Sequence, residues 1–440
     1  PAPRLVFTVD KSVSRSGRDA YAVRGGKGAL TFTGANERSL WYALYDFFAR
    51  EGCAWFWDGD RLPARHAVDL GKVDFRSEAD KEVRGLRYFA HRSLRRFQAE
   101  QWDWDDWSRE LEWMLKARIN FFMLRLGTVD LFQRAFPDIV KYPEGFECPE
   151  AFGYYNYRHH LWKLEAQSAL RAKVLGRAHE LGLMTAEDTG TPTHWYSRTP
   201  LAYLDAVRPK LLAQSNASYN QRTGLVLDIR ERENLDAYFK LTEASIAAYG
   251  GGRTPDFFHT IGLGERRCFK DRKDNHELKK FALKQFLDRA SRDYPKAKRL
   301  LAGWDFYFTW HPDEVQDLVK SLDPERDIIW DYEGDSTRDY REEMLDIGGN
   351  NFTKWGVCNK FPYTYSIFLA FESALDIRAN YPLIEKRQKI VQDDPKCAGY
   401  IFWPESSHTD TLLLNFGFQD DLVANNPCDL IDNVVLRKSS

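Results

Sequence analysis

Two glutamates each follow a segment with the apolar character of a buried strand. One segment reads Cys397-Ala-Gly-Tyr-Ile-Phe-Trp-Pro-Glu405, and the other reads Pro255-Asp-Phe-Phe-His-Thr-Ile-Gly-Leu-Gly-Glu265. A carboxylate at the C-terminal end of a strand is typical of a barrel that presents a catalytic group there. Cleavage of a glycosidic bond uses two such carboxyl groups. The pattern predicts Glu265 and Glu405 as a catalytic pair, although among 65 Asp and Glu residues some follow strands by chance.

Further candidate residues lie where the predicted strands end or in the loops that follow. Trp304, after Gly303, is either a platform for a sugar ring or a core aromatic residue. Glu333 either orients a hydroxyl group or belongs to a structural ion pair. His91 either donates to a sugar oxygen or is a structural histidine, and His194, in a long loop, is expected to line the pocket. The sequence shows no strong metal-ligand spacing, so neither a metal nor a cofactor is predicted.

Strand-like and helix-like segments alternate from about residue 84 onward, which favours a parallel sheet. We predict an α/β fold, a (β/α)8 TIM-type barrel, in which the loops after the strands build the active-site face. The expected strands are 85–91, 121–127, 183–188, 257–265, 300–307, 327–333, 353–359 and 398–405. The expected helices are 104–118, 164–180, 235–248, 276–291 and 312–322.

The predicted organisation has three parts. Residues 1–80 form a small α/β accessory domain, residues 81–425 the catalytic barrel, and residues 426–440 a C-terminal tail. The accessory domain is expected to contain a glycine-rich hairpin over 22–33, a helix over 36–50 and a strand over 52–57. Its helix is expected to place Leu40, Leu44, Phe47 and Phe48 on one side.

Charge, apolar runs and aromatic content indicate which kinds of molecule the protein is expected to bind. The net charge is only -2 and the basic residues are scattered, which argues against a nucleic-acid partner. No apolar run approaches the length of a membrane span. Aromatic residues make up 15% of the chain, which suits a protein that stacks rings on sugars, although most of them are expected in the core. Because the chain begins at Pro1, we expect a signal peptide to have been removed and the protein to be secreted or periplasmic.

Several motifs, in collinear order, resemble glycoside hydrolase family 89, the α-N-acetylglucosaminidases. The stretch Arg87-Tyr-Phe-Ala-His-Arg-Ser, followed by Trp102-Asp-Trp-Asp-Asp-Trp107, resembles the opening of that family's barrel. Leu263-Gly-Glu265 resembles the motif of the family's acid/base, and Trp403-Pro-Glu405 resembles that of its nucleophile. The resemblance implies a retaining mechanism, in which Glu405 attacks the anomeric carbon and Glu265 protonates the leaving oxygen.

The resemblance also implies which residues contact the sugar. His91 and Ser93 stand where the family has Asn and Cys, and Asn359-Lys-Phe-Pro-Tyr363 begins the stretch that replaces a sugar-binding motif. With Trp403 of the nucleophile motif, these positions give Ser93, Asn359, Tyr363 and Trp403 as further substrate-binding candidates. Gly264 replaces the Asn that precedes the acid/base in the family, so the identity of the sugar stays open.

The sequence therefore predicts a retaining exo-α-glycosidase that releases a terminal α-linked N-acetylhexosamine, first of all N-acetylglucosamine, from a glycan. Two alternatives stay open. One is a related barrel glycosidase of different specificity, an α-glucuronidase or an α-N-acetylgalactosaminidase. The other is a barrel that binds glycans without cleaving them. The presence of both Glu265 and Glu405 favours an enzyme.

Overall fold

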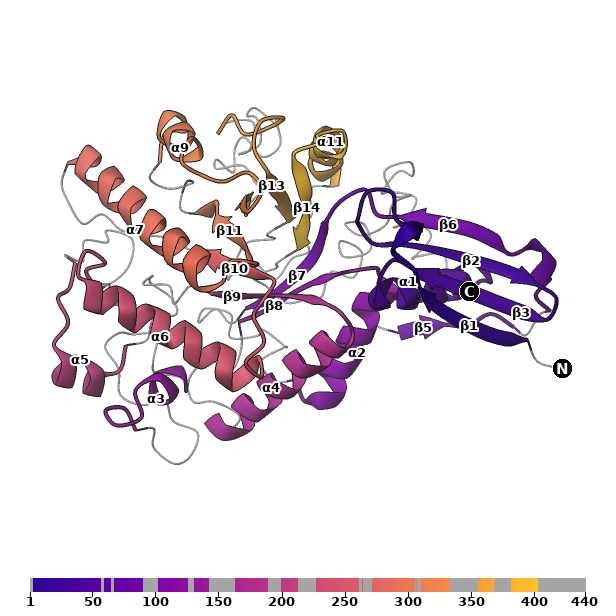
Figure 1. The fold of residues 1–440 in the computed structure, drawn as a ribbon, viewed down its shortest axis with the longest axis horizontal. Helices are drawn as coiled ribbons and strands as arrows, with labels where there is room; N and C mark the ends of the chain where they lie inside the picture. Colours follow the sequence, from indigo (N-terminus) through magenta and orange to yellow (C-terminus); the bar gives the residue numbers. More distant parts are fainter. Residues whose placement is uncertain are drawn as a thin grey trace.

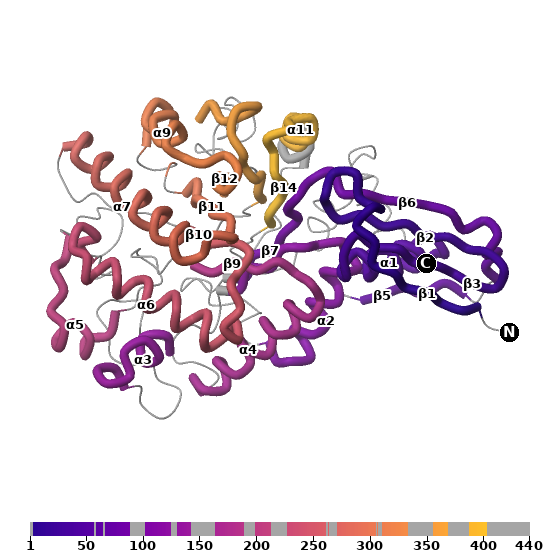
Figure 2. The backbone as a smooth tube through the Cα atoms, in the orientation of Figure 1, coloured from indigo at the N-terminus to yellow at the C-terminus, as the bar shows by residue number. Residues whose placement is uncertain are grey.

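The structure is a computed structural model, and its elements run along one long axis with an N-terminal sheet at one end and a barrel at the other (Figure 1). The tube in Figure 2 follows the chain from the last strand of the N-terminal sheet into the first strand of the barrel. The structure describes residues 3–56, 59–64, 67–89, 102–125, 130–141, 163–188, 199–212, 227–260, 263, 271–304, 306, 310–332, 355–367 and 381–402.

The N-terminal unit contains a four-stranded sheet in the order β1-β3-β2-β6. The predicted glycine-rich hairpin is present, since β2 and β3 pair antiparallel and Gly28 takes the left-handed conformation in the turn between them. Strands β1 and β6 were not predicted. The elements of the unit are β1 (Arg4–Val9), the 3-10 turn η1 (Lys11–Val13), β2 (Ala20–Gly26), β3 (Ala29–Gly34), α1 (Glu37–Arg50), β4 (Ala54–Phe56), β5 (Gly59–Arg61), η2 (Leu70–Lys72) and β6 (Asp74–Glu78).

Helix α1 begins where the sequence predicts, but its buried face differs from the expected one. The Asn36 side chain accepts a hydrogen bond from the backbone N–H of Ser39 and so caps the helix. Its buried residues are Ser39, Tyr42, Ala43 and Phe47. Phe48, which was expected on the same side as Leu40, Leu44 and Phe47, is 40% exposed. The spacing of apolar residues predicts a helix here, but the side chains that become buried depend on how α1 packs on the sheet.

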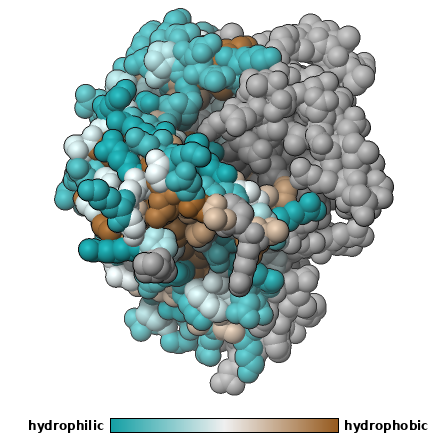
Figure 3. All heavy atoms as spheres, turned by 90° about the vertical axis from the view of Figure 1, so that its right-hand side faces the viewer, coloured by the Kyte–Doolittle hydropathy of each residue, from teal (hydrophilic) through white to brown (hydrophobic). Residues whose placement is uncertain are grey.

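Strand β1 is an edge strand of this sheet and carries exposed apolar side chains. Leu5, Phe7 and Val9 point to one face of the strand and are 50%, 48% and 49% exposed. Figure 3 views this end of the molecule and shows an apolar area among hydrophilic residues.

The eight strands that follow form a closed barrel in the order β10-β11-β12-β13-β14-β7-β8-β9, and every pair of neighbours is parallel. The predicted TIM-type barrel is confirmed. The strands are β7 (Val83–Phe89), β8 (Phe121–Arg125), β9 (Met184–Asp188), β10 (Phe257–Thr260), β11 (Lys298–Ala302), β12 (Asp327–Trp330), β13 (Tyr363–Ile367) and β14 (Cys397–Phe402).

One predicted strand is wrong. The segment 353–359 was expected to form the seventh strand of the barrel, but 355–360 lies in turns, and β13 starts at Tyr363. Gly356 and Asn359 both have positive φ, at 69° and 59°, which extended backbone does not allow. The strand is instead the run Tyr363-Thr-Tyr-Ser-Ile367, which is aromatic and β-branched and buried at every position.

Helices cover the outside of the barrel, with α4, α6 and α7 lying along one side of it in Figure 1. None of the described helices is both long and apolar enough to cross a membrane. The predicted helices are present, with boundaries that differ by a few residues. The described helices are α2 (Trp104–Lys116), α3 (Leu131–Ala135), α4 (Leu164–Glu180), α5 (Leu201–Val207), α6 (Arg232–Tyr249), α7 (Arg272–Asp293), α9 (Pro312–Val319) and α11 (Tyr381–Gln392).

Closure of the barrel depends on a glycine in β14, where this strand meets β7. Gly399 has a φ of 154°, and a Cβ added to it would lie 1.9 Å from the carbonyl oxygen of Val83. The register between β13 and β14 shifts next to this position, because Tyr363 pairs with Cys397 and Thr364 with Gly399. The last strand therefore fits against the first one only because residue 399 has no side chain.

A buried carboxylate joins the N-terminal unit to the barrel. Asp19 accepts hydrogen bonds from Arg38 of α1, from Arg84 of β7 and from Asn120, which precedes β8. Burial opposes ionisation of Asp19, but the two guanidinium groups outweigh it and lower its pKa to about 2.

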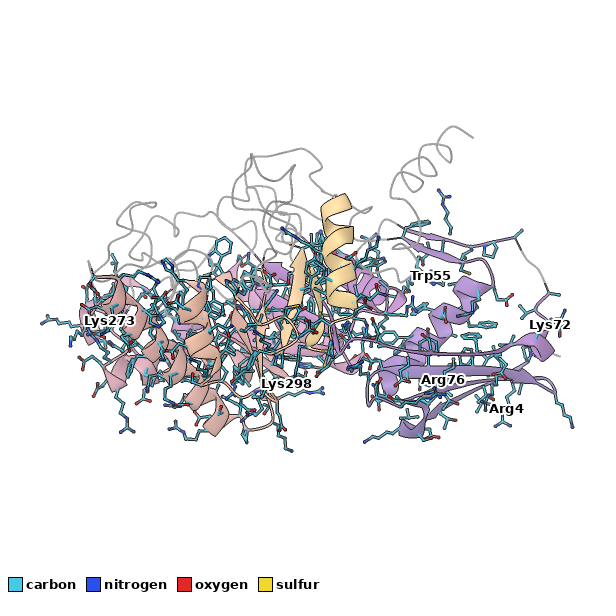
Figure 4. The ribbon with its side chains drawn as sticks, turned by 90° about the horizontal axis from the view of Figure 1, so that it is seen from above. Arg4, Trp55, Lys72, Arg76, Lys273 and Lys298 are labelled. Atoms are coloured by element: carbon cyan, nitrogen blue, oxygen red, sulfur yellow. The ribbon has the colours of Figure 1, made fainter. Side chains whose placement is uncertain are left out.

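In Figure 4, Lys298, at the start of β11, lies on the side toward the N-terminal unit, and it forms an ion pair with Glu82.

Candidate active site

A chain of three hydrogen-bonded side chains lies at the carboxyl ends of the barrel strands. His259 of β10 lies between Asp188, the last residue of β9, and Tyr332, which follows β12. The His259 Nδ1 atom is 2.8 Å from Asp188 Oδ1, and Nε2 contacts the Tyr332 hydroxyl. Since an ionised carboxylate only accepts, we assign the ring proton to Nδ1, so that Nε2 accepts from Tyr332.

The three hydrogen-bonded side chains differ in their exposure to solvent. His259 is fully buried and Tyr332 is 2% exposed, whereas the side chain of Asp188 is 21% exposed. Asp188 is thus the member of the chain that solvent or a ligand reaches. The other two lie behind it, inside the barrel.

Aromatic rings and one cation surround the histidine. The His259 ring stacks on Tyr332 with centroids 5.9 Å apart, and it meets Trp330 edge-on at 5.3 Å. The guanidinium of the buried Arg87, from β7, lies 5.3 Å from the Trp330 ring and 5.2 Å from the Tyr332 ring. These contacts hold each ring in one orientation. The interior of the barrel at this level is therefore aromatic and polar rather than aliphatic.

A partly buried glutamate, Glu187, lies next to Asp188 in β9. Successive residues of a strand point to opposite faces, so Glu187 faces the helices outside the barrel. Burial raises the pKa of Glu187, and the nearby Arg171 of α4 partly opposes this. Glu187 thus belongs to the packing of the helices on the barrel, while Asp188 belongs to its mouth.

Trp304 is the one predicted site residue that the described part of the structure places at this end of the barrel. It follows β11, which ends at Ala302, and its ring lies 6.3 Å from the Tyr332 ring. Trp304 is partly exposed, as a sugar platform has to be. Its position suits the predicted role, which stays a prediction.

Most of the predicted site residues lie outside the described residues, although the strands that lead to several of them are described. Glu265 follows β10, which ends at Thr260, and Glu405 follows β14, which ends at Phe402. In a parallel barrel these two strands end at the same face. The predicted site residues outside the described part of the chain are Glu265, Glu405, His91, Ser93, His194, Glu333 and Trp403.

Asn359 and Tyr363 lie at the opposite end of the barrel, where strands begin. Tyr363 is the first residue of β13, and Asn359 lies in the turn before it. The Tyr363 hydroxyl and the Asn359 backbone N–H donate to Asp394 Oδ2 over 2.9 and 2.8 Å. Burial opposes ionisation of Asp394, but these and other hydrogen bonds hold its pKa below the usual value. This position does not fit the predicted contact of Asn359 and Tyr363 with a sugar at the active-site face.

Sequence reasoning missed Asp188, His259, Tyr332 and Arg87. Asp188 and His259 lie within predicted strands that were read for their apolar pattern alone. A useful signal is a polar residue near the C-terminal end of an apolar strand, such as His259 after Phe257 and Phe258. Among the residues that the structure describes, no group of three or more His, Cys, Asp or Glu side chains could hold a metal ion.

Comparison with known proteins identifies the fold. No family model matches the chain, and no curated protein does. The family 89 glycoside hydrolase from Clostridium perfringens, in complex with PUGNAc, has a TM-score of 0.68 and 13% identity over 98% of this chain and 48% of its own. A family 89 structure from the same organism, with two glutamate-to-glutamine substitutions and its substrate GlcNAc-alpha-1,4-galactose, has a TM-score of 0.69, 13% identity and coverage of 99% and 48%.

A second family shares the architecture less closely. An inactive mutant of the family 20 exo beta-N-acetylglucosaminidase from Vibrio harveyi has a TM-score of 0.54 and 9% identity over 96% of this chain and 64% of its own. This chain spans about half the length of the family 89 structures, at 48%. At such identities the likeness shows the fold, a TIM-type barrel with a small N-terminal domain.

Proposed function

We propose that this protein is a glycoside hydrolase that removes terminal α-linked N-acetylglucosamine from glycans with retention of configuration. The observation that carries the proposal is a closed parallel barrel, similar to a family 89 structure over 99% of this chain, in which β10 and β14 end at the same face and the sequence continues to Glu265 and Glu405. Barrels of this kind hold their catalytic groups at the carboxyl ends of strands.

The similar structures support the choice of sugar. One family 89 structure holds 2-acetamido-1,2-dideoxynojirmycin, and another holds its substrate GlcNAc-alpha-1,4-galactose. The family 20 structure is described as an exo beta-N-acetylglucosaminidase, and a related one is in complex with N-acetylglucosamine. Terminal N-acetylglucosamine is common to both groups, while the linkage differs. The higher TM-score to family 89 favours the α linkage.

The proposed mechanism divides two roles between the glutamates. Glu405, after β14, attacks the anomeric carbon and forms a covalent glycosyl–enzyme intermediate, while Glu265, after β10, protonates the leaving oxygen. Glu265 then takes a proton from the water that releases the sugar. Carboxyl groups about 5 to 5.5 Å apart are required for this retaining route. The two-glutamate variant among the similar structures fits a pair of this kind.

A panel of aryl glycosides tests the proposal. The protein is incubated with aryl α- and β-N-acetylglucosaminides, an aryl α-N-acetylgalactosaminide and an aryl α-glucuronide, and release of the aryl group is measured. We expect cleavage of the α-N-acetylglucosaminide with kcat/KM at least about 100-fold above the others, because a pocket that hydrogen-bonds a substrate group rejects analogues that lack it. Cleavage of the β-linked substrate alone, or of none of the four, would contradict the proposal.

A further inference from the structure

The hydrogen-bonded chain Asp188–His259–Tyr332 has a specific role in the geometry of the barrel mouth. We propose that Asp188 binds a hydroxyl group of the terminal sugar, and that His259 and Tyr332 are positioning residues that hold its carboxylate in the binding orientation. This inference rests on the proposed glycan substrate. It assigns specificity to residues that the sequence did not single out as site residues.

Exposure to solvent is greatest at the Asp188 end of the hydrogen-bonded chain. Tyr332 and His259 are buried, whereas the side chain of Asp188 is 21% exposed. Burying an ion costs more than burying a neutral polar group, so the carboxylate of such a chain stays at the end that water reaches. The Asp188 carboxylate lies at that end, where a sugar hydroxyl can take the place of water as its hydrogen-bond donor.

Asp188 is fixed at its backbone as well as at its side chain. The hydroxyl of the buried Thr242, on α6, donates to the Asp188 carbonyl over 3.0 Å. The Asp188 N–H lies 3.2 Å from a carboxylate oxygen of Glu187. With His259 holding Oδ1, the end of β9 is anchored from the barrel interior and from the helix layer. Groups that read hydrogen-bond geometry need such support.

A second aspartate, the buried Asp394, is hydrogen-bonded directly to a tyrosine and provides a comparison. Asp394, at the opposite end of the barrel, accepts from the Tyr363 hydroxyl and from the backbone N–H groups of Asn359 and Lys396. Its carboxylate closes the turn before β13, so its role is to hold loops together. Asp188 instead ends a barrel strand, and its Oδ1 atom is hydrogen-bonded to His259 of the barrel mouth.

The chemistry of a carboxylate suits a sugar. Each hydroxyl group donates one hydrogen bond, and a carboxylate accepts more strongly than a neutral oxygen. In the tautomer assigned above, the Nδ1–H of His259 donates to Asp188 while Nε2 accepts from Tyr332, so the imidazole orients the carboxylate. A hydroxyl bound in this way should contribute about 10- to 100-fold to affinity.

Sugar binding tests this inference separately from catalysis. Isothermal titration calorimetry measures the affinity of the whole protein for N-acetylglucosamine, and for the analogues in which one hydroxyl at a time is replaced by hydrogen. We expect one of these analogues to bind the unmodified protein about 10- to 100-fold more weakly than the parent sugar. In Asp188→Asn the parent sugar and that analogue should bind alike. Tyr332→Phe, which leaves Asp188 in place, should reduce the difference between them.

Asp394→Asn is the matched control, because it disturbs an aspartate–tyrosine pair at the other end of the barrel. It should lower the melting temperature and leave the discrimination between the two sugars unchanged. If the sugar binds and Asp188→Asn keeps full discrimination at every hydroxyl, the inference is overturned while the proposed function stands. If the unmodified protein binds no N-acetylglucosamine, the proposed function fails and the inference fails with it.

Discussion

At the scale of single residues, the site depends on side chains that come from distant parts of the sequence. Asp188, His259 and Tyr332 belong to three different strand segments, and the barrel alone brings them together. Trp304 joins them through the Tyr332 ring. Each of these side chains contacts another of the group, so a change in one is expected to disturb the positions of the others.

Trp304→Ala should weaken the binding of N-acetylglucosamine about 10-fold or more, because the sugar loses the apolar surface on which its ring stacks. The matched control is Trp41→Ala, which removes a tryptophan that is 39% exposed on α1 of the N-terminal unit. Calorimetry compares the two variants. Equal affinities for the sugar would show that Trp304 is a core aromatic residue, as the alternative interpretation of the sequence has it.

Tyr363→Phe should lower stability and leave sugar binding unchanged. The hydroxyl of Tyr363 bonds to Asp394 at the end of the barrel where the strands begin, so its loss leaves a buried carboxylate with one donor fewer. Such a loss costs about 1 to 3 kcal/mol. Thermal unfolding measures the cost and calorimetry measures the binding. A large fall in affinity at unchanged melting temperature would restore Tyr363 to the substrate site.

At the scale of elements, the sequence predicted most strands because each is a short apolar run between turns. The seventh was misplaced because Trp355-Gly-Val-Cys358 is also apolar, and only the positive φ of Gly356 and Asn359 rules out a strand there. Periodicity does not report backbone conformation at single residues. For the same reason it did not foresee the register shift at Gly399.

Gly399→Ala should destabilise the protein by at least about 2 kcal/mol, since the new Cβ would meet the carbonyl oxygen of Val83 and its φ is strained for any residue with a side chain. Gly176→Ala, in the middle of α4, is the control. A Cβ there meets nothing within 4 Å, so we expect no loss, and a gain of up to about 1 kcal/mol. Chemical denaturation measures both. Equal midpoints would argue that β14 and β7 are not held as closely as the structure shows.

At the scale of the whole molecule, the N-terminal unit and the barrel share buried polar contacts. Asp19 links α1 to β7, and the Tyr42 hydroxyl on α1 donates to the carbonyl of Ile119 beside β8. The sequence predicted both parts but not this junction, because its members are separated by many residues and none belongs to a motif. We therefore expect the two parts to unfold together.

The Asp19 junction gives a dependence of stability on pH with a definite sign. The pKa of Asp19 is about 2 in the folded protein against an ordinary 3.8, so ionised Asp19 favours the folded state. Its contribution, about 2 kcal/mol, is present above about pH 4 and is lost as the pH falls toward 2. Asp19→Asn should remove most of this acid sensitivity. Asp74→Asn, which removes an exposed pair with Arg24, should change little.

The central claim is that a barrel of this fold cleaves a terminal α-linked N-acetylglucosamine with Glu265 and Glu405. The most direct test is nuclear magnetic resonance of the sugar released from GlcNAc-α-1,4-galactose by the unmodified protein and by Glu265→Gln and Glu405→Gln. The account predicts that the α anomer of N-acetylglucosamine appears first, and that each variant is slower by orders of magnitude while its melting temperature stays close to that of the unmodified protein. First appearance of the β anomer, or undiminished cleavage by either variant, would contradict it.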